Sequence, residues 1–219
     1  MLKAVLLDLD GVITDTAAYH YLAWKELASE IGVEIDLEFN EQLKGVSRME
    51  SLDRILRHGG KAHAFTPAEK LTLAAKKNAQ YVALLEQVTS ADIYPGIREL
   101  LNELKAAGIY KVLASASKNA SQILASLGIA GDLDYIVDPD EVAQGKPAPD
   151  MFLRGAAVVG AAPEECIGIE DAKAGIEAIK AAGMIAVGIG DESMLGASGA
   201  DVVLPATDGL SLSFLRSLL

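Results

Sequence analysis

The sequence has a single cysteine, Cys166, among its 219 residues. One thiol excludes a disulfide bond within the chain and is typical of proteins from a reducing compartment. The sequence also has no apolar run close to the roughly 18 residues that a membrane-spanning helix needs. Its first apolar run is interrupted by Asp8 and Asp10, too early for a signal peptide. We therefore expect a cytoplasmic protein without a membrane partner.

Basic residues are scarce as well. The chain has 19 Lys and Arg against 31 Asp and Glu, which gives a net charge of −12. Such a chain repels nucleic acid and anionic lipid, so we expect neither as a partner. A small anionic substrate remains compatible with this charge, because local cations or a bound metal can reverse the potential inside one cleft.

Short apolar runs recur along the chain, and most of them are separated by segments of helical character. Continuous runs, without polar alternation, are typical of strands that are buried on both faces, as in a parallel sheet covered by helices. The runs are Ala4–Leu7, Lys111–Ala114, Tyr135–Val137, Cys166–Ile169 and Ile185–Ile189, with Val202–Leu204 as a candidate sixth. The pattern predicts an α/β fold with a doubly wound parallel sheet.

Glycines mark the ends of the helices that alternate with these runs. The predicted helices are Pro95–Ala107, Ala120–Leu127 and Ala172–Ala182, and each is followed directly by a glycine. This regular alternation begins near residue 93. It supports a single doubly wound core in the second half of the chain.

The first strand is followed by about 80 residues without a convincing strand. Three helices are predicted there: Ala17–Ile31, one opened by a capping box over Ser47–Glu50, and one that runs from the capping box Thr66–Glu69 to about Gln87. We therefore expect a catalytic core formed by residues 1–15 and 91–219. An all-helical cap domain, residues 16–90, is inserted into it.

Asp8 and Asp10 follow the first apolar run. Residues two apart on a strand point the same way, and the carboxyl end of a parallel strand opens into a crevice where ligands bind. Two carboxylates there could bind a metal, or could divide nucleophilic and acid–base roles. A pair of acidic loop residues without a function is the alternative, and the pair alone does not exclude it.

Further polar clusters follow other strands. Glu170 and Asp171 come directly after a buried strand, where adjacent acids are costly without a cation; Asp171 could also cap the next helix. The oxygen-rich set lacks His and Cys, which favours magnesium over zinc. The run Ser115–Asn119 precedes a helix and offers an anion site, helix capping, or both. Lys146 is held extended by the following proline, although a plain surface lysine is the alternative.

Four strings, DLDGVITDT, ASASKN, GKPAPD and GIEDAKAG, resemble in order and spacing the four motifs of the haloacid dehalogenase superfamily of phosphotransferases. The resemblance covers essentially the whole chain, including the helical cap. Within the superfamily, DLDGVITDT, LKGVSR and ASASKN are most similar to the β-phosphoglucomutase family. The resemblance implies an isomerase that interconverts β-D-glucose 1-phosphate and β-D-glucose 6-phosphate. It would act through an aspartyl-phosphate enzyme and a β-glucose 1,6-bisphosphate intermediate.

The resemblance also implies roles for individual residues. Asp8 would be the nucleophile and Asp10 the general acid–base, while Ser115 and Lys146 would steady the phosphoryl group. Magnesium would be held by Asp8, the backbone carbonyl of Asp10, Glu170 and Asp171. Substrate contacts are expected from Thr16, His20, Trp24, Lys44, Gly45, Val46, Ser47, Arg48, Ser51, Lys77, Asn78, Ser117, Lys118 and Asn119.

Some of these cap residues have arguments of their own. Arg48 lies in the first turn of its helix, where the helix dipole disfavours a cation, and there it could grip a second phosphate in a bidentate fork. His20 and Trp24 share a helix face; Trp24 could simply pack in the cap with His20 at its rim, or His20 could align the substrate as the cap closes. Thr16 is a reasonable hinge position.

Three functions remain open on the sequence: the mutase, a sugar-phosphate phosphatase that uses water as the acceptor, and a sugar-phosphate or metal-binding module without catalysis. The core motifs do not separate the first two. The intact pair Asp8 and Asp10 disfavours the third, since a pure binder needs no nucleophile. We expect a small sugar phosphate as the ligand and a monomer.

Overall fold

A six-stranded sheet forms the centre of the computed structural model, which describes residues 1–219. The strand order is β3-β2-β1-β4-β5-β6, and every neighbouring pair is parallel. The strands are β1 Ala4–Leu7, β2 Tyr110–Leu113, β3 Tyr135–Ile136, β4 Cys166–Glu170, β5 Ile185–Ile189 and β6 Val202–Leu204. The predicted doubly wound parallel fold is confirmed, including the sixth strand.

The central strand β1 divides its side chains between the two faces of the sheet. Val5 and Leu7 belong to one apolar cluster, whereas Ala4 and Leu6 belong to another. This alternation follows from the two-residue period of a strand. Because both faces are covered, every residue of β1 is buried, which explains why the sequence shows a continuous apolar run.

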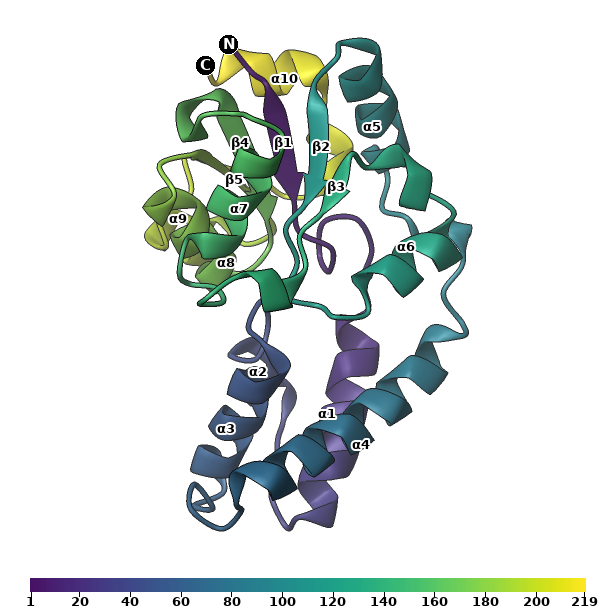
Figure 1. Ribbon diagram of the computed structural model, residues 1–219, viewed down its shortest axis with the longest axis vertical. Coiled ribbons are helices and arrows are strands. Elements are labelled where there is room, and N and C mark those ends of the chain that lie inside the picture. Colours follow the sequence, from purple (N-terminus) through teal and green to yellow (C-terminus); the bar gives the residue numbers. More distant parts are fainter.

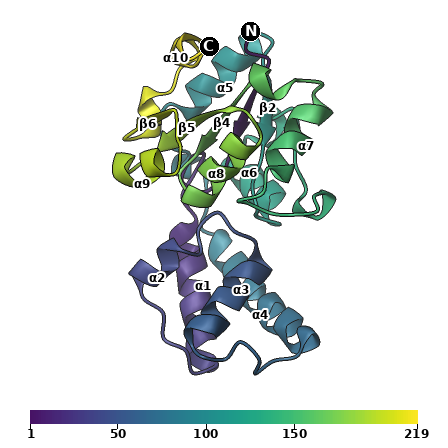
Figure 2. The same cartoon turned by 90° about the vertical axis from the view of Figure 1, so that its left-hand side faces the viewer.

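Three helices cover each face of the sheet (Figures 1 and 2). The helices α5 (Ile97–Ala106), α6 (Ala120–Leu127) and α10 (Leu212–Ser217) supply the first cluster. The other face is covered by α7 (Asp150–Val158), α8 (Lys173–Ala181) and α9 (Glu192–Ala197). Short 3-10 turns lie at Ser90–Asp92, Ala130–Asp132, Pro139–Glu141, Pro163–Glu165 and Thr207–Gly209.

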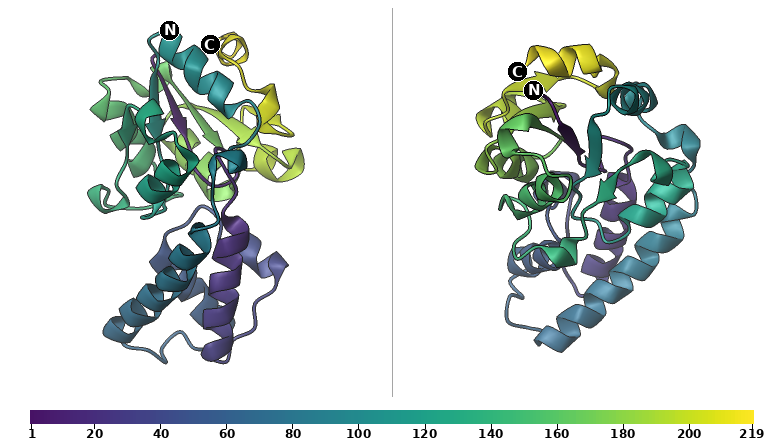
Figure 3. Two further views of the ribbon diagram at one scale, coloured as in Figure 1. Left: turned by 90° about the vertical axis from the view of Figure 1, so that its right-hand side faces the viewer. Right: turned by 45° about the horizontal axis from the view of Figure 1, so that its top comes forward.

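Four helices lie apart from the sheet, beyond the carboxyl ends of its strands (Figures 1 and 2). They are α1 (Ala17–Glu30), α2 (Leu37–Glu41), α3 (Arg48–His58) and α4 (Pro67–Leu85). These helices have their own apolar cluster, built around Trp24, Leu52 and Leu56. The two chain ends lie together at the opposite end of the molecule (Figure 3). No helix has the length and apolar character that would let it span a membrane.

The ends of the helices agree with the sequence signals, with two corrections. The Thr66–Glu69 capping box forms with both of its hydrogen bonds. The predicted box at Ser47 forms only in part, because the Glu50 carboxylate pairs with Arg54 and Arg57 instead of bonding back to Ser47. The helix expected from Pro95 begins at Ile97, since Gly96 before it adopts a φ of +82° outside the helical region.

The middle of the sheet is tightly packed against α8 at Gly168. A Cβ added at Gly168 in β4 would lie 2.6 Å from the Ile179 side chain, which is fully buried in α8. We expect Gly168→Ala to lower the free energy of unfolding by about 1–3 kcal/mol through overpacking. Denaturant unfolding measures this change. Gly131→Ala is the control, because nothing lies within 4 Å of its added Cβ; an equal loss in both variants would contradict the packing argument.

Candidate active site

The carboxyl ends of three adjacent strands bring the core candidates together. Asp8 follows β1, Ser115 follows β2 by two residues, and Glu170 is the last residue of β4. The parallel register pairs Leu7 with Ile169, so the two acidic chain segments leave the sheet side by side. The backbone amide of Asp8 donates to the carbonyl of Ile169 at 3.0 Å and extends the sheet to the nucleophile candidate.

Gly11 makes the turn after Asp8 and Asp10 possible. Its φ is +78°, which L side chains rarely adopt, and a Cβ added there would lie 2.1 Å from Asp171 Oδ2. Its amide donates to the carbonyl of Thr14 at 2.7 Å. The glycine therefore lets the Asp171 carboxylate lie directly against the loop that carries Asp8 and Asp10.

Lys146 occupies the centre of the acidic cluster. Its Nζ donates to Asp8 Oδ1 at 2.6 Å and to Glu170 Oε2 at 2.7 Å, and its side chain is fully buried. Burial alone would lower the pKa of this ammonium, but the charges of Asp8 and Glu170 outweigh burial and raise the pKa. The surface-lysine alternative is thus wrong, because Lys146 is a permanently charged partner of two buried carboxylates.

Three carboxylates near Lys146 could share one cation. Asp8, Glu170 and Asp171 each offer an oxygen, and these oxygens lie within 4.8 Å of one another. Burial and then the neighbouring Asp8 raise the pKa of Glu170 to about 7, while burial and then Glu170 raise that of Asp171. Negative charge therefore exceeds what Lys146 balances. An all-oxygen donor set with this excess charge fits a hard divalent cation.

Asp10 is held by the segment that leads into α1. Its Oδ1 accepts from the Thr16 amide at 2.9 Å and from the Thr16 hydroxyl. That hydroxyl also lies 2.7 Å from the Tyr81 hydroxyl on α4. Burial raises the pKa of Asp10 to about 6, the Thr16 hydrogen bond opposes the rise, and the Asp8 charge adds to it. A carboxyl with such a pKa can both donate and accept a proton near neutral pH.

A second chain of contacts approaches Asp10 from the helices α1 and α4. His20 Nε2 lies 3.9 Å from Asp10 Oδ2, and His20 Nδ1 lies 2.6 Å from Lys77 Nζ. Lys77 is 1% exposed and its ammonium lies over the rings of Trp24 and Tyr81. Burial, followed by repulsion from Arg48, lowers the pKa of Lys77 to about 7.

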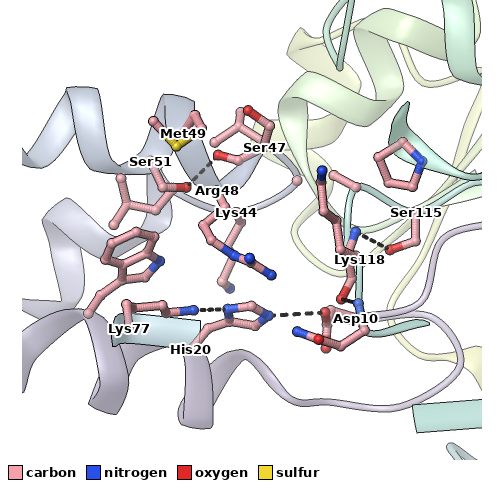
Figure 4. Close-up of a pocket in the computed structure, with 18 of the residues that line it drawn as sticks. Asp10, His20, Lys44, Ser47, Arg48, Met49, Ser51, Lys77, Ser115 and Lys118 are labelled. Atoms are coloured by element: carbon pink, nitrogen blue, oxygen red, sulfur yellow. Dashed lines mark hydrogen bonds and ion pairs between the residues drawn. The ribbon is translucent and has the colours of Figure 1, made fainter. Parts of the chain in front are cut away.

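One cavity of about 400 Å³ contains most of the predicted substrate contacts. It lies between the four helices and the strand ends, so both parts of the molecule line it (Figure 4). The predicted residues in its wall are Asp8, Asp10, His20, Trp24, Lys44, Gly45, Val46, Ser47, Arg48, Ser51, Lys77, Ser115, Ser117, Lys118, Asn119 and Asp171.

Four predicted residues are outside this wall. Lys146 and Glu170 lie buried beneath it, where they contact Asp8 directly or through each other. Thr16 is also buried and reaches the site only through Asp10. Asn78 accepts a 2.9 Å hydrogen bond from Asn119 Nδ2. Direct substrate contact by Thr16 and Asn78 therefore has no support in the shape of the cavity.

Arg48 and Lys118 differ in how their charges are balanced. Lys118 Nζ pairs with Asp140, 2.6 Å from its Oδ2. Arg48 is half-buried and makes no hydrogen bond or ion pair, and burial lowers its pKa. Figure 4 shows its guanidinium extending from α3 into the space between the helices and the core. An unpaired guanidinium in a cavity favours an anionic ligand.

Tyr81 and Asp140 are among the residues of the site that the sequence did not predict. Tyr81 stacks on His20 with ring centroids 3.9 Å apart and bonds to Thr16. Its position four residues after Lys77 on the same helix face was a usable signal. Asp140 has no comparable signal, because its pairing with Lys118 depends on how a short turn folds back toward the cavity.

A family model for haloacid dehalogenase-like hydrolases matches residues 2–183. The chain belongs to the haloacid dehalogenase family. Within the family, it is 51% identical over 216 residues to β-phosphoglucomutase of Bacillus subtilis (strain 168), which covers 98% of this chain and 94% of that protein.

Two further relatives show the range of activities near this chain. A crystal structure of β-phosphoglucomutase from Clostridium difficile has a TM-score of 0.96 and 47% identity, and the match covers 99% of this chain and 96% of that one. A phosphorylated carbohydrates phosphatase of Thermotoga maritima is 28% identical over 84% of this chain and 82% of that protein.

The buried ammonium of Lys77 predicts a pH dependence of stability. Its pKa is about 7 in the folded chain and about 10.4 when unfolded, so the folded chain binds fewer protons between these values. Titration of Lys77 should therefore increase the free energy of unfolding as the pH rises from 7 to 9. Lys77→Met should abolish this increase and stabilise the fold at pH 7 by about 1–3 kcal/mol. Denaturant unfolding at each pH measures both effects.

Lys76→Met is the matched control, since Lys76 is the preceding residue and its side chain is 52% exposed. We expect this variant to keep the wild-type pH profile. If Lys77→Met kept that profile as well, the ammonium would not be the titrating group.

Proposed function

We propose that the chain is an isomerase that interconverts β-D-glucose 1-phosphate and β-D-glucose 6-phosphate. The chain is 51% identical to the Bacillus subtilis β-phosphoglucomutase over 98% of its length, and this similarity supports the proposed reaction. The observation that carries the proposal is Arg48, an unpaired guanidinium in the same cavity as Asp8 and Asp10. A bisphosphate intermediate needs one site for the reacting phosphoryl group and another for the phosphate that does not react.

Asp8 is the proposed nucleophile. One of its carboxylate oxygens bonds to phosphorus while the bond from phosphorus to the sugar oxygen breaks. Lys146 fixes the orientation of Asp8 and offsets the repulsion between the carboxylate and the incoming phosphate. Ser115, also buried at the strand ends, is the proposed second contact for the transferring group.

Asp10 is the proposed proton carrier. When phosphorylated Asp8 gives its group to the C6 hydroxyl, Asp10 accepts the hydroxyl proton; when Asp8 takes the C1 phosphoryl group, Asp10 returns a proton to the sugar oxygen. The two transfers, with a turn of the bisphosphate between them, convert the 1-phosphate into the 6-phosphate. The pKa of about 6 suits a group that must work in both directions.

The carboxylates of Asp8, Glu170 and Asp171, with the backbone carbonyl of Asp10, are the proposed ligands of Mg²⁺. The all-oxygen cluster and its uncompensated charge support this assignment. Bound there, the ion would offset the negative charge of the transferring phosphoryl group.

Residues 16–90 are the proposed cap over a core of residues 1–15 and 91–219. The sugar phosphate would be contacted from the cap by Lys44 to Arg48, Ser51, His20, Trp24 and Lys77. From the core it would be contacted by Ser117, Lys118 and Asn119. The mixed lining of the cavity supports this division. We also propose that the protein is a cytoplasmic monomer; a single, buried cysteine is typical of proteins from a reducing compartment.

The mutase proposal is tested with β-glucose 1-phosphate and a trace of the 1,6-bisphosphate. We expect glucose 6-phosphate as the main product. A sugar-phosphate phosphatase would share the core chemistry and differ in the acceptor, so it would give glucose and free phosphate. That outcome would overturn the mutase and leave the roles proposed for Asp8 and Asp10 in place.

Arg48→Ala should lower kcat/KM of the mutase about 10- to 100-fold, because a charged hydrogen-bond donor to the distal phosphate is lost. Hydrolysis of a small phosphate ester, which has no distal phosphate, should change much less. Arg57→Ala is the control on the same helix, since that side chain is 59% exposed and lies outside the cavity. An equal loss of both activities in Arg48→Ala would contradict a distal phosphate site.

Asp8→Asn should abolish turnover of every phosphate ester, because an amide is not a nucleophile toward phosphorus. Mass spectrometry of the protein after brief exposure to substrate should show phosphorylated wild type and unmodified variant. Asp132→Asn, in the turn before β3, should behave as wild type. Phosphorylation of Asp8→Asn would assign the nucleophile to another residue.

A further inference from the structure

Two asparagines connect the four helices α1–α4 directly to the core. Asn119 Nδ2, in the core, donates to Asn78 Oδ1, in α4, at 2.9 Å. No other hydrogen bond or ion pair joins residues 17–88 to residues 97–219. The remaining polar links between the two parts run through the connecting segments, at Asp10, Thr14 and Thr16.

The side chain of Asn119 does not cap the helix that it begins. It occupies the N-cap position of α6, where an asparagine normally accepts a hydrogen bond from the first turn. In this structure its side chain makes no capping bond and reaches α4 instead. The capping interaction that α6 forgoes indicates that the contact with Asn78 is the preferred use of this amide.

A second close approach between residues 17–88 and the core is of a different kind. A Cβ added at Gly45, in the loop before α3, would lie 3.1 Å from the Ala172 methyl of the core. This close approach is apolar and sets no direction. The asparagine pair therefore supplies the directional contact that fixes the position of α4 relative to α6.

We propose that Asn78 is a positioning residue whose hydrogen bond with Asn119 holds the four helices closed over the core. The bond acts on the reaction through Lys77, the residue that precedes Asn78 in α4. Lys77 contacts His20, and His20 faces Asp10. Fixing α4 at Asn78 thus fixes the side chains that cover Asp10.

Closure has a defined consequence for the chemistry, and this step rests on the proposed mutase function. Phosphorylated Asp8 can give its group to a sugar hydroxyl or to water, and a closed cavity limits access of water. We call the Asn78–Asn119 hydrogen bond the latch. Weakening the latch should shift transfer of the phosphoryl group from the sugar hydroxyl toward water. The ratio of free phosphate to glucose 6-phosphate reports that shift.

The test compares three variants at position 78. Asn78→Leu keeps a similar shape without an acceptor, Asn78→Ala removes the side chain, and Asn78→Asp keeps an acceptor for Asn119. We expect the first two to raise the ratio of phosphate to glucose 6-phosphate about two- to tenfold, the range for loss of one hydrogen bond. Asn78→Asp should return it toward wild type, and Lys76→Met, on the exposed face of α4, should leave it unchanged.

A second readout does not depend on activity. Small-angle scattering, or distances between spin labels on α3 and α7, should show a larger open fraction in Asn78→Leu and Asn78→Ala than in wild type. Asn119→Ala should open the molecule equally, and the double variant Asn78→Ala/Asn119→Ala should open it no further, because both changes remove one bond.

Two outcomes separate the latch from the mutase. An unchanged open fraction in both Asn78→Leu and Asn78→Ala, or fully additive effects of Asn78→Ala and Asn119→Ala, would overturn the latch. If wild type released only glucose and phosphate while the variants still opened, the mutase would fail and the latch would stand.

Discussion

Lys146 lies fully buried between the carboxylates of Asp8 and Glu170, and the rest of the site depends on this arrangement. Two buried carboxylates in contact are costly unless a cation separates them, and removal of one partner from such a set typically costs about 3–5 kcal/mol. The sheet order makes the arrangement possible. Because β1 and β4 are neighbours in register, Asp8 and Glu170 reach the same point, and the segment after β3 brings the ammonium between them.

Asp10 lies only two residues after Asp8, but its hydrogen-bond partners are different from those of the Lys146 cluster. Asp8 belongs wholly to the core, whereas Asp10 is bonded to Thr16 at the start of α1, and Thr16 is bonded to Tyr81 on α4. The position of Asp10, the proposed proton carrier, therefore depends on α1 and α4, while Asp8, the proposed nucleophile, stays fixed to the sheet. Under the proposed roles, this division would couple closure of the cavity to completion of the acid–base site.

The parts of the fold that were predictable from the sequence are those set by local interactions. Buried strands are continuous apolar runs, and helices end at glycines, so strands and most helix ends were predicted within about two residues. The Ser47 capping box forms only in part, because Arg54 and Arg57 bind the Glu50 carboxylate. Four helices were not predicted: Leu37–Glu41, Asp150–Val158, Glu192–Ala197 and Leu212–Ser217. The contacts Tyr81 to Thr16, Asp140 to Lys118 and Asn78 to Asn119 join residues 22 to 65 positions apart, and no local pattern specifies them.

The two walls of the cavity carry opposite charge, and this contrast explains how an acidic protein can receive a phosphate. The core wall is dominated by carboxylates, which Lys146 only partly balances. Lys44 and Arg48 lie on the helical side, and Arg48 has no anion of its own. A dianionic phosphate is therefore attracted to the helical wall and repelled by the carboxylates of the core. The proposed closure would bring the charge of Arg48 toward the core, so a bound phosphate would supply part of the attraction that holds the two walls together.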